Sequence, residues 1–249
     1  MKIILFAKRN TKEVLRDPLN LFFGLGFPLI LLALLSVINA NIPPEANNPM
    51  FAIGNLAPGL AMFGSVFMAL FAGMILAKDR TSSFLTRLFT SPMTAADFLL
   101  GYTVPMIVMT IVQAMITLLA ACAIGLPFTV NIIPAALVTT ITSLLFIGIG
   151  LLLGSLMSDK AVGGICGALL TNVAGWLSGI FIPIDLIGGT FETITNILPF
   201  FHSVEAIRKV LGGDYRGAFP DLAVVLGYTV VIYGLAVIVF RRKMSDDKV

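Results

Sequence analysis

The sequence predicts an all-α membrane protein with six transmembrane helices, and three observations lead to this prediction. First, 58% of the 249 residues are hydrophobic and only 12% are charged, about half of the charge that covers the surface of a soluble domain. Second, the mean hydropathy is +1.01. Third, the apolar residues gather in six runs that are each long enough to cross a bilayer as a helix. We therefore expect a single membrane domain over residues 1–249.

The six apolar runs are separated by polar or turn-forming segments. Lipid cannot satisfy backbone polar groups, so each run is expected to form a helix with internal hydrogen bonds. The alternating ten-residue segments of a membrane β-barrel are absent from the sequence. The expected spans cover residues 19–38, 56–77, 98–124, 132–156, 161–184 and 222–240.

Lysine and arginine are distributed unequally between the two sides of the predicted bundle. Thirteen of them flank the spans on the side of both termini, whereas Arg208, Lys209 and Arg216 lie on the other side. Short segments rich in these residues stay in the cytoplasm. The pattern predicts a multi-pass protein of a bacterial-type plasma (inner) membrane with both termini cytoplasmic. It accounts for the net charge of +3 without a nucleic-acid partner.

Residues 1–17 predict a basic amphipathic helix that lies in the inner membrane interface. At 100° per residue, the charged residues fall on one side and most apolar residues fall on the other, with Leu5 and Phe6 as exceptions. Asp17-Pro18 then turns the chain into the first span. The charged side holds Lys2, Lys8, Arg9, Lys12, Glu13 and Arg16, and the apolar side holds Ile3, Ile4, Ala7, Val14 and Leu15.

The segment 78–97 connects the second and third spans and contains a second amphipathic pattern. Phe84, Leu85, Leu88 and Phe89 form an apolar stripe at helical spacing, and Arg87 lies on a different face. Thr94 and Asp97 have the spacing of a capping box that opens the third span. From this loop alone, a short helix across the cytoplasmic ends of two spans and an ordinary surface turn are both possible.

The segment 185–221 is too short and too polar to cross the membrane. Its apolar residues predict one or two helices that enter the outer leaflet and return. A further short helix follows, with His202, Glu205 and Arg208 on one face at helical spacing. Pro183 and Pro199 bracket the first part of the region.

The sequence contains no pattern that binds ATP or supports catalysis. A G-x-x-x-x-G-K-[ST] phosphate loop is absent, His202 is the single histidine, and no His, Cys, Asp or Glu cluster has ligand spacing. Residues 98–157 include no charged side chain, which argues against ion-coupled transport and against a charged channel filter. We expect neither enzymatic activity nor a cofactor or metal in this chain.

Small and polar residues within the spans have two interpretations each. Three G-x-x-x-G patterns start at Gly150, Gly163 and Gly175, and they favour close helix packing within the bundle or across a dimer. Gln113 and Asn172 indicate either interhelical hydrogen bonds or contact with cargo. The eleven methionines indicate either an adaptable pocket or ordinary packing.

The complete arrangement resembles the ABC type-2 transporter permease family over essentially the whole chain. One matching stretch is Lys78-Asp79-Arg80 through Leu88-Phe89-Thr90-Ser91-Pro92-Met93, which is similar to the family's coupling-helix region. The other is Phe181-Ile182-Pro183, followed by Ile197-Leu198-Pro199-Phe200 and Glu205-Ala206-Ile207-Arg208. It is similar to the family's Pro…Leu-Pro…Glu-Ala-x-Arg pattern after the fifth span.

The resemblance implies the membrane subunit of an ATP-driven exporter. Two permease copies, or two paralogues, would pair with two cytoplasmic ABC ATPase subunits that hold the ATP and Mg²⁺. The cargo would be lipophilic or amphipathic, such as a drug, a lipid or a glycan. A sodium efflux permease and a non-transporting membrane assembly subunit are the alternatives.

The resemblance also implies roles for particular residues. The expected contacts with the ATPase are Phe84, Leu85, Arg87, Leu88 and Phe89. The expected outer cap of the transport route includes Pro183, Pro199, Glu205 and Arg208. The expected residues along the substrate path are Met62, Asn172 and Trp176, with membrane lipid around the bundle.

Overall fold

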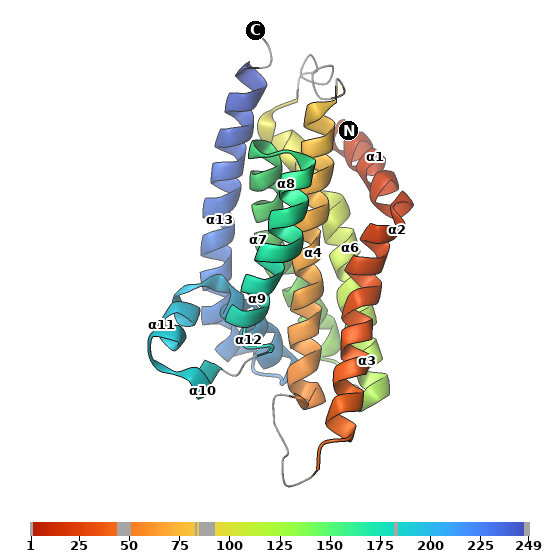
Figure 1. Ribbon diagram of the computed structural model, residues 1–249, viewed down its shortest axis with the longest axis vertical. Helices are drawn as coiled ribbons and strands as arrows, with labels where there is room; N and C mark the ends of the chain where they lie inside the picture. The colour runs from red at the N-terminus through yellow and green to blue at the C-terminus, as the bar shows by residue number, and fades with distance from the viewer. Residues whose placement is uncertain (1, 44–50, 83, 85–92, 182–183, 247–249) are drawn as a thin grey trace.

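The computed structural model describes residues 2–43, 51–82, 84, 93–181 and 184–246. Every regular element in this part of the chain is helical (Figure 1), and six helices are long and apolar enough to span a membrane. The predicted fold class, all-α with six spans, is confirmed. Both termini lie at the same end of the bundle (Figure 1), which we call the terminal end.

The helices follow one another along the chain with short connections. At the terminal end, α1 (Lys2–Arg16) packs against the bundle beside the first span. The second to fourth spans are α4 (Ile53–Thr81), α6 (Ala95–Ile124) and α7 (Ile132–Leu156). The region before the last span forms α10 (Ile184–Ile187), α11 (Gly189–Ile197) and α12 (Pro199–Leu211), and α13 (Tyr215–Asp246) is the last span.

Two of the spans contain a wider helical turn. The first span runs from Pro18 to Ala40 through α2 (Pro18–Leu21), the π-helix η1 (Phe22–Gly26) and α3 (Phe27–Ala40). Pro28 lacks the N–H that an α-helix would donate to Gly24, which accounts for the wider turn at this place. The fifth span is built from α8 (Asp159–Gly164), the π-helix η4 (Ile165–Leu170) and α9 (Thr171–Leu177).

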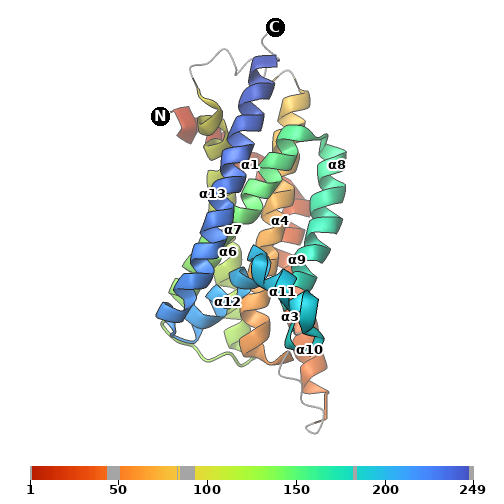
Figure 2. The same cartoon turned by 90° about the vertical axis from the view of Figure 1, so that its left-hand side faces the viewer.

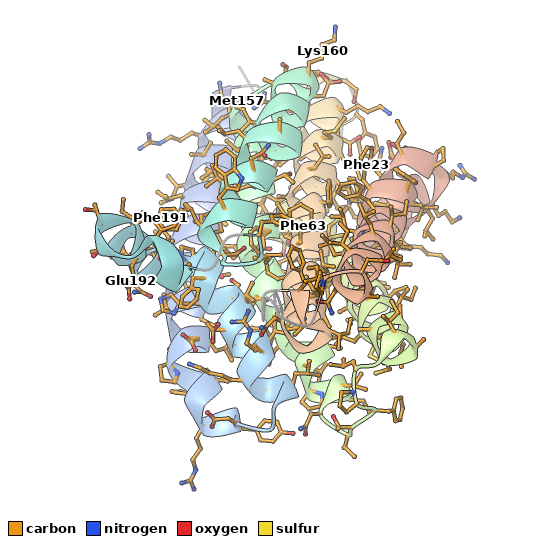
Figure 3. All side chains as sticks on the ribbon, turned by 60° about the horizontal axis from the view of Figure 1, so that its bottom comes forward. Phe23, Phe63, Met157, Lys160, Phe191 and Glu192 are labelled. Carbon is orange, nitrogen blue, oxygen red and sulfur yellow. The ribbon has the colours of Figure 1, made fainter. Side chains whose placement is uncertain are left out.

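Helix α4 forms the centre of the bundle. In its most apolar stretch 89% of the residues are buried, whereas the corresponding share is 17% for the first span and for the last. Figures 1 and 2 show α4 between α3, α6, α7 and the fifth span, and α12 reaches beneath the bundle to contact α4 and α7. The aromatic rings of the first span, including Phe23, meet those of α4, including Phe63 (Figure 3).

The first of the G-x-x-x-G patterns packs within the chain. A Cβ atom added to Gly150 of α7 would lie 2.0 Å from the Ala69 carbonyl oxygen of α4, and one added to Gly154 would lie 2.5 Å from the Gly73 carbonyl oxygen. Only glycine permits the two backbones to approach this closely. The Gly163 and Gly167 positions leave more space, because Met74 and Leu70 lie 3.7–4.0 Å from the added atom.

Three helix ends bear on the predicted spans. Thr94 and Asp97 form the predicted capping box at the start of α6, with Thr94 N–H donating to Asp97 at 2.8 Å. The fifth span ends at Leu177, seven residues before the predicted end, and Gly179 follows with a φ of 74° that breaks the helix. The last span begins at Tyr215, before the predicted start at residue 222.

Candidate functional sites at the two ends of the bundle

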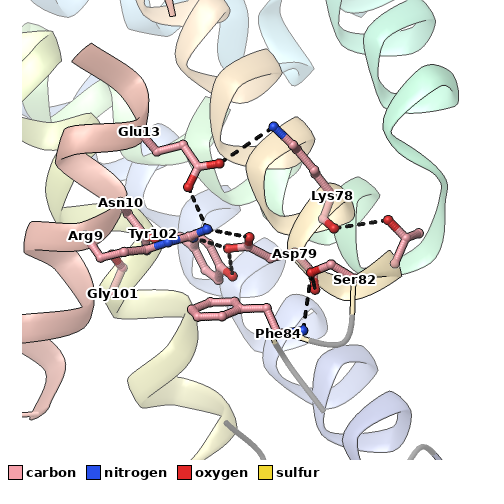
Figure 4. A network of polar contacts seen from close by, with 10 residues as sticks. Arg9, Asn10, Glu13, Lys78, Asp79, Ser82, Phe84, Gly101 and Tyr102 are labelled. Atoms are coloured by element: carbon pink, nitrogen blue, oxygen red, sulfur yellow. Dashed lines mark hydrogen bonds and ion pairs between the residues drawn. The ribbon is translucent and has the colours of Figure 1, made fainter. Parts of the chain in front are cut away.

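Asp79 lies near the terminal end of α4 with 3% of its surface exposed. Arg9 of α1 donates from both terminal nitrogens, with Nη2 to Oδ1 at 2.8 Å and Nη1 to Oδ2, and the Tyr102 hydroxyl donates to Oδ2 at 2.8 Å (Figure 4). Two-pronged pairing between guanidinium and carboxylate is a strong form of charge-assisted hydrogen bond. The network fixes α1 to α4 and α6.

Further charges surround Arg9. Its Nη2 also lies 2.6 Å from Glu13, which in turn lies 3.8 Å from Lys78 Nζ. Burial disfavours the charged guanidinium, but the hydrogen bond and the negative charge of Asp79 outweigh this effect and raise the pKa of Arg9 above its ordinary value. Arg9 therefore stays a cation between two carboxylates.

The face of α1 that packs on the bundle differs from the prediction. Phe6, which did not fit the predicted pattern, is buried, and its ring meets Tyr102 edge-on with the centroids 5.0 Å apart. It rests on Gly101, where an added Cβ would lie 2.3 Å from the Phe6 ring. Asn10 is fully buried and donates to the Gly101 carbonyl at 3.1 Å. Helical periodicity alone separated charge from apolar surface, but tertiary contacts placed Arg9, Asn10 and Phe6 on one packed face.

Phe84 is the one predicted ATPase contact that lies within the described residues. Its ring stacks on Phe6 with the centroids 6.4 Å apart, and the Arg9 guanidinium lies 4.4 Å from the ring centroid. Leu85, Arg87, Leu88 and Phe89 lie outside the described part of the chain. Their contact with an ATPase stays a prediction, and the chain that leads into them is attached to α1 through Phe84.

Sequence reasoning missed the Asp79 network, although it singled out the Lys78-Asp79-Arg80 stretch. An acidic residue at the end of an apolar span was the available signal, since such a residue needs a partner when buried. Arg80 has a separate role: its guanidinium donates to the carbonyls of Ser155 and, at 3.0 Å, of Met157. It thereby satisfies backbone groups where α7 ends.

A second polar cluster joins α12 to α13 at the end opposite the termini. Asp221 is buried, and its carboxylate lies 2.6 Å from His202 Nδ1 and accepts from Lys209 Nζ at 2.6 Å. The other His202 nitrogen donates to the Asn196 carbonyl at 2.8 Å. The hydrogen bond to Asp221 raises the pKa of Lys209, so its ammonium stays charged at neutral pH.

The predicted outer-cap residues lie beside this cluster. Pro199 occupies the first turn of α12, where proline is well tolerated, and Glu205 forms an ion pair with Arg208. Pro183 lies outside the described residues. Figure 3 shows α11, with Phe191 and Glu192, standing out from the bundle. A position of these helices within the outer leaflet stays a prediction.

Replacing Asp221 with alanine is expected to destabilise the junction of α12 and α13. The substitution removes the acceptor of two buried or half-buried donors, and hydrogen bonds to charged groups contribute about 2 kcal/mol. Thermal unfolding of the purified protein in mild detergent would measure the loss. The control is Glu192→Ala on the exposed face of α11. Equal unfolding temperatures for the two variants would contradict the role assigned to Asp221.

The predicted substrate-path residues do not converge. Met62 is fully buried in α4, while Trp176 is 54% exposed on α9. Asn172, one turn before Trp176, is exposed and its amide donates to the Ala168 carbonyl at 2.8 Å. Contact between cargo and Met62 would require the helices around α4 to move, and the role of all three residues stays a prediction.

Gln113 is the other polar residue that the sequence singled out within a span. Its amide nitrogen donates to Thr117 of the same helix at 3.1 Å. The side chain fills the space above Gly64 of α4, where an added Cβ would lie 2.2 Å from that nitrogen. Gln113 therefore packs between α6 and α4, and its hydrogen bond lies within α6.

Comparison with known proteins places this architecture. The ABC-2 type transporter family model matches residues 1–211. The chain is 24% identical over 208 residues to the "Probable multidrug ABC transporter permease YbhR" of Escherichia coli (strain K12); the match covers 81% of this chain but 55%, about half, of that protein. It is also 24% identical to "Nodulation protein J" of Rhizobium meliloti (strain 1021), covering 92% of this chain and 85% of that protein. The chain belongs to the ABC-2 type transporter family and is a multi-pass membrane protein.

Proposed function

We propose that this chain is the membrane-spanning permease subunit of an ATP-driven ABC exporter in a bacterial inner membrane, with both termini in the cytoplasm. The observation that carries the proposal is the family match over residues 1–211. Transport against a gradient needs an energy source, and the sequence lacks a phosphate-binding loop. A separate cytoplasmic ATPase, which holds the ATP and Mg²⁺, supplies that energy.

The proposed cargo is lipophilic or amphipathic. The long stretch of α6 and α7 without charged residues supports an uncharged route, because charged cargo and coupling ions require ionisable partners within the membrane. The name of one relative, a probable multidrug permease, agrees with such a cargo. A second permease copy or a paralogue completes the route, and the exposed apolar face of the fifth span, which includes Leu169 and Trp176, is available to line it.

The proposed connection to the ATPase is the segment that begins at Phe84. The ATPase contacts Phe84, Leu85, Arg87, Leu88 and Phe89, and its motion reaches α4 through the covalent chain. The same motion reaches α1, because Phe84 stacks on Phe6 and lies under Arg9. At the other end, the α10–α12 region covers the exit of the route.

Affinity purification of the tagged chain from its native membrane tests the partner. We expect an ATPase subunit to co-purify with the unmodified chain and to be lost from the variant Arg87→Glu with Leu88→Asp. The matched control is Arg216→Glu with Phe219→Asp, which makes the same type of change on exposed residues of α13 at the opposite end. Retention of the ATPase by the first variant would contradict the docking segment, and absence of any ATPase would contradict the permease proposal.

Transport is tested after reconstitution of the purified complex into vesicles. We expect ATP-dependent movement of a rhodamine-class dye and no movement of radioactive sodium. Movement of sodium alone would favour a sodium efflux permease. ATP hydrolysis without movement of either would favour a non-transporting assembly subunit.

A further inference from the structure

A groove of about 830 Å³ lies at the terminal end, between α1, the start of α2, the last turns of α4 and the first residue of α8. Five cationic and three acidic side chains line it, together with apolar ones. The mixture of strong charge and apolar surface distinguishes this groove from an ordinary packing gap.

The acidic side chains of the groove have partners within the protein. Glu13 pairs with Arg9 at 2.6 Å and lies 3.8 Å from Lys78. Asp17 caps α2 and accepts from the backbone N–H groups of Leu19 at 3.0 Å and of Asn20 at 3.4 Å. Their charge is thus largely used in holding the groove together.

Three cations of the groove form a row along α1. Lys8, Lys12 and Arg16 follow one another at intervals of four residues, which is about 6 Å along a helix, and all three are exposed. No described residue forms an ion pair with any of them. Like charges at this spacing repel one another, so an anion bound along the row would relieve the repulsion.

Apolar residues lie next to this row on the side of the membrane. Leu5 is 62% exposed and Met74 is 37% exposed, and both line the groove. On α4, Met74 and Ile75 precede Lys78 by about one turn, so apolar surface gives way to charge toward the terminal end. The first span begins at Pro18, directly after Arg16. The charged row therefore lies at the depth where lipid headgroups meet the hydrocarbon.

We propose that this groove is a binding site for an anionic phospholipid. The phosphate lies against Lys8, Lys12 and Arg16, and an acyl chain lies along Leu5 and Met74. Basic pockets between membrane helices recognise phosphorylated headgroups in this way. A soluble phosphate would use the charges but would leave the apolar strip exposed. The site needs neither an ATPase nor cargo, so it does not depend on the proposed transport function.

The test uses the full chain with Leu5→Trp and Trp176→Phe, which puts the one indole in the groove. The protein is reconstituted into bilayer discs of phosphatidylcholine that contain increasing fractions of brominated phosphatidylglycerol or of brominated phosphatidylcholine as quencher. We expect the anionic lipid to quench the indole at about tenfold lower mole fraction than the zwitterionic lipid.

Removal of the charged row should abolish this preference. In Lys8→Gln, Lys12→Gln and Arg16→Gln combined, we expect the two lipids to quench equally. The control combines Lys160→Gln, Arg242→Gln and Lys243→Gln, which removes the same charge from exposed residues of the terminal end outside the groove (Lys160 is labelled in Figure 3). The control should keep the preference. Preference retained by the first variant, or lost equally by the control, would overturn the proposal.

Two further measurements distinguish a phospholipid held by charge from a soluble anion and from an effect of side-chain shape. Lys8→Arg with Lys12→Arg keeps the charge and should keep the preference for phosphatidylglycerol; its loss in this variant would overturn the proposal. Inorganic phosphate added to the detergent-solubilised protein should leave the indole emission unchanged and should not displace the lipid. Displacement by millimolar phosphate, a concentration on the order of 10³ times that of a typical micromolar ligand, would assign the groove to a soluble anion instead.

Discussion

Replacing Gly150 with alanine is expected to separate α7 from α4 and to lower the stability of the fold by about 3 kcal/mol. The added Cβ would lie 2.0 Å from the Ala69 carbonyl oxygen and 2.7 Å from the Ala69 Cα, whereas ordinary contact begins at 3.4 Å. The obstructing atoms are backbone, so no side-chain rotation relieves the clash. Because α4 is the central helix, its displacement affects every contact that α4 makes with the other spans.

The matched control for this substitution is Gly234→Ala in α13. An atom added to Gly234 meets nothing within 4 Å, and alanine is the better helix former by about 1 kcal/mol. The two variants are compared by the fraction of monodisperse protein that remains after heating in mild detergent. We expect Gly150→Ala to be lost at a lower temperature than the unmodified protein and Gly234→Ala to match or exceed it. Equal survival of the two variants would show that the α4–α7 contact does not limit stability.

The same glycines show how far the sequence alone leads. A small residue every four positions predicts that a helix approaches a neighbour closely, but it does not identify the neighbour. The partner surface, Ala69 and Gly73 on α4, repeats the same spacing of small residues, so the pairing is recognisable only once both helices are placed. The bounds of α7 could be predicted to the residue, since polar residues flank an uninterrupted apolar run on both sides.

The other ends were harder to predict for physical reasons that differ between them. Composition extends the fifth span beyond Leu177, because Ile180 and Phe181 are apolar, yet the left-handed backbone at Gly179 stops the helix. For the last span, Asp221 signalled the edge of the membrane segment, but helix formation tolerates a charge that is paired with His202 and Lys209. The Arg9–Asp79 pair joins residues that are 70 positions apart, and local periodicity carries no information about such a contact.

The two sides of that pair are expected to respond unequally to mutation. Arg9→Gln leaves the Asp79 carboxylate buried with Tyr102 as its remaining charge-stabilising donor, and an uncompensated buried charge costs about 3 kcal/mol. Asp79→Asn leaves a guanidinium whose side chain is 35% exposed and which still pairs with Glu13, so we expect a smaller loss of about 1 kcal/mol. Thermal unfolding in detergent measures both, with Lys12→Gln on the exposed side of α1 as the control.

The double variant Arg9→Gln with Asp79→Asn separates a net attraction from the cost of an unpaired charge. Neither charge then remains buried, so its stability should return toward that of Asp79→Asn, which is non-additive behaviour of contacting residues. Limited trypsin digestion gives an independent measure of whether α1 stays docked, because release exposes the backbone at Lys12 and Arg16. We expect the fastest cleavage in Arg9→Gln. If Asp79→Asn were instead the less stable single variant, Asp79 would owe its burial to Tyr102, and α1 would be held mainly by Phe6 and Asn10 on Gly101.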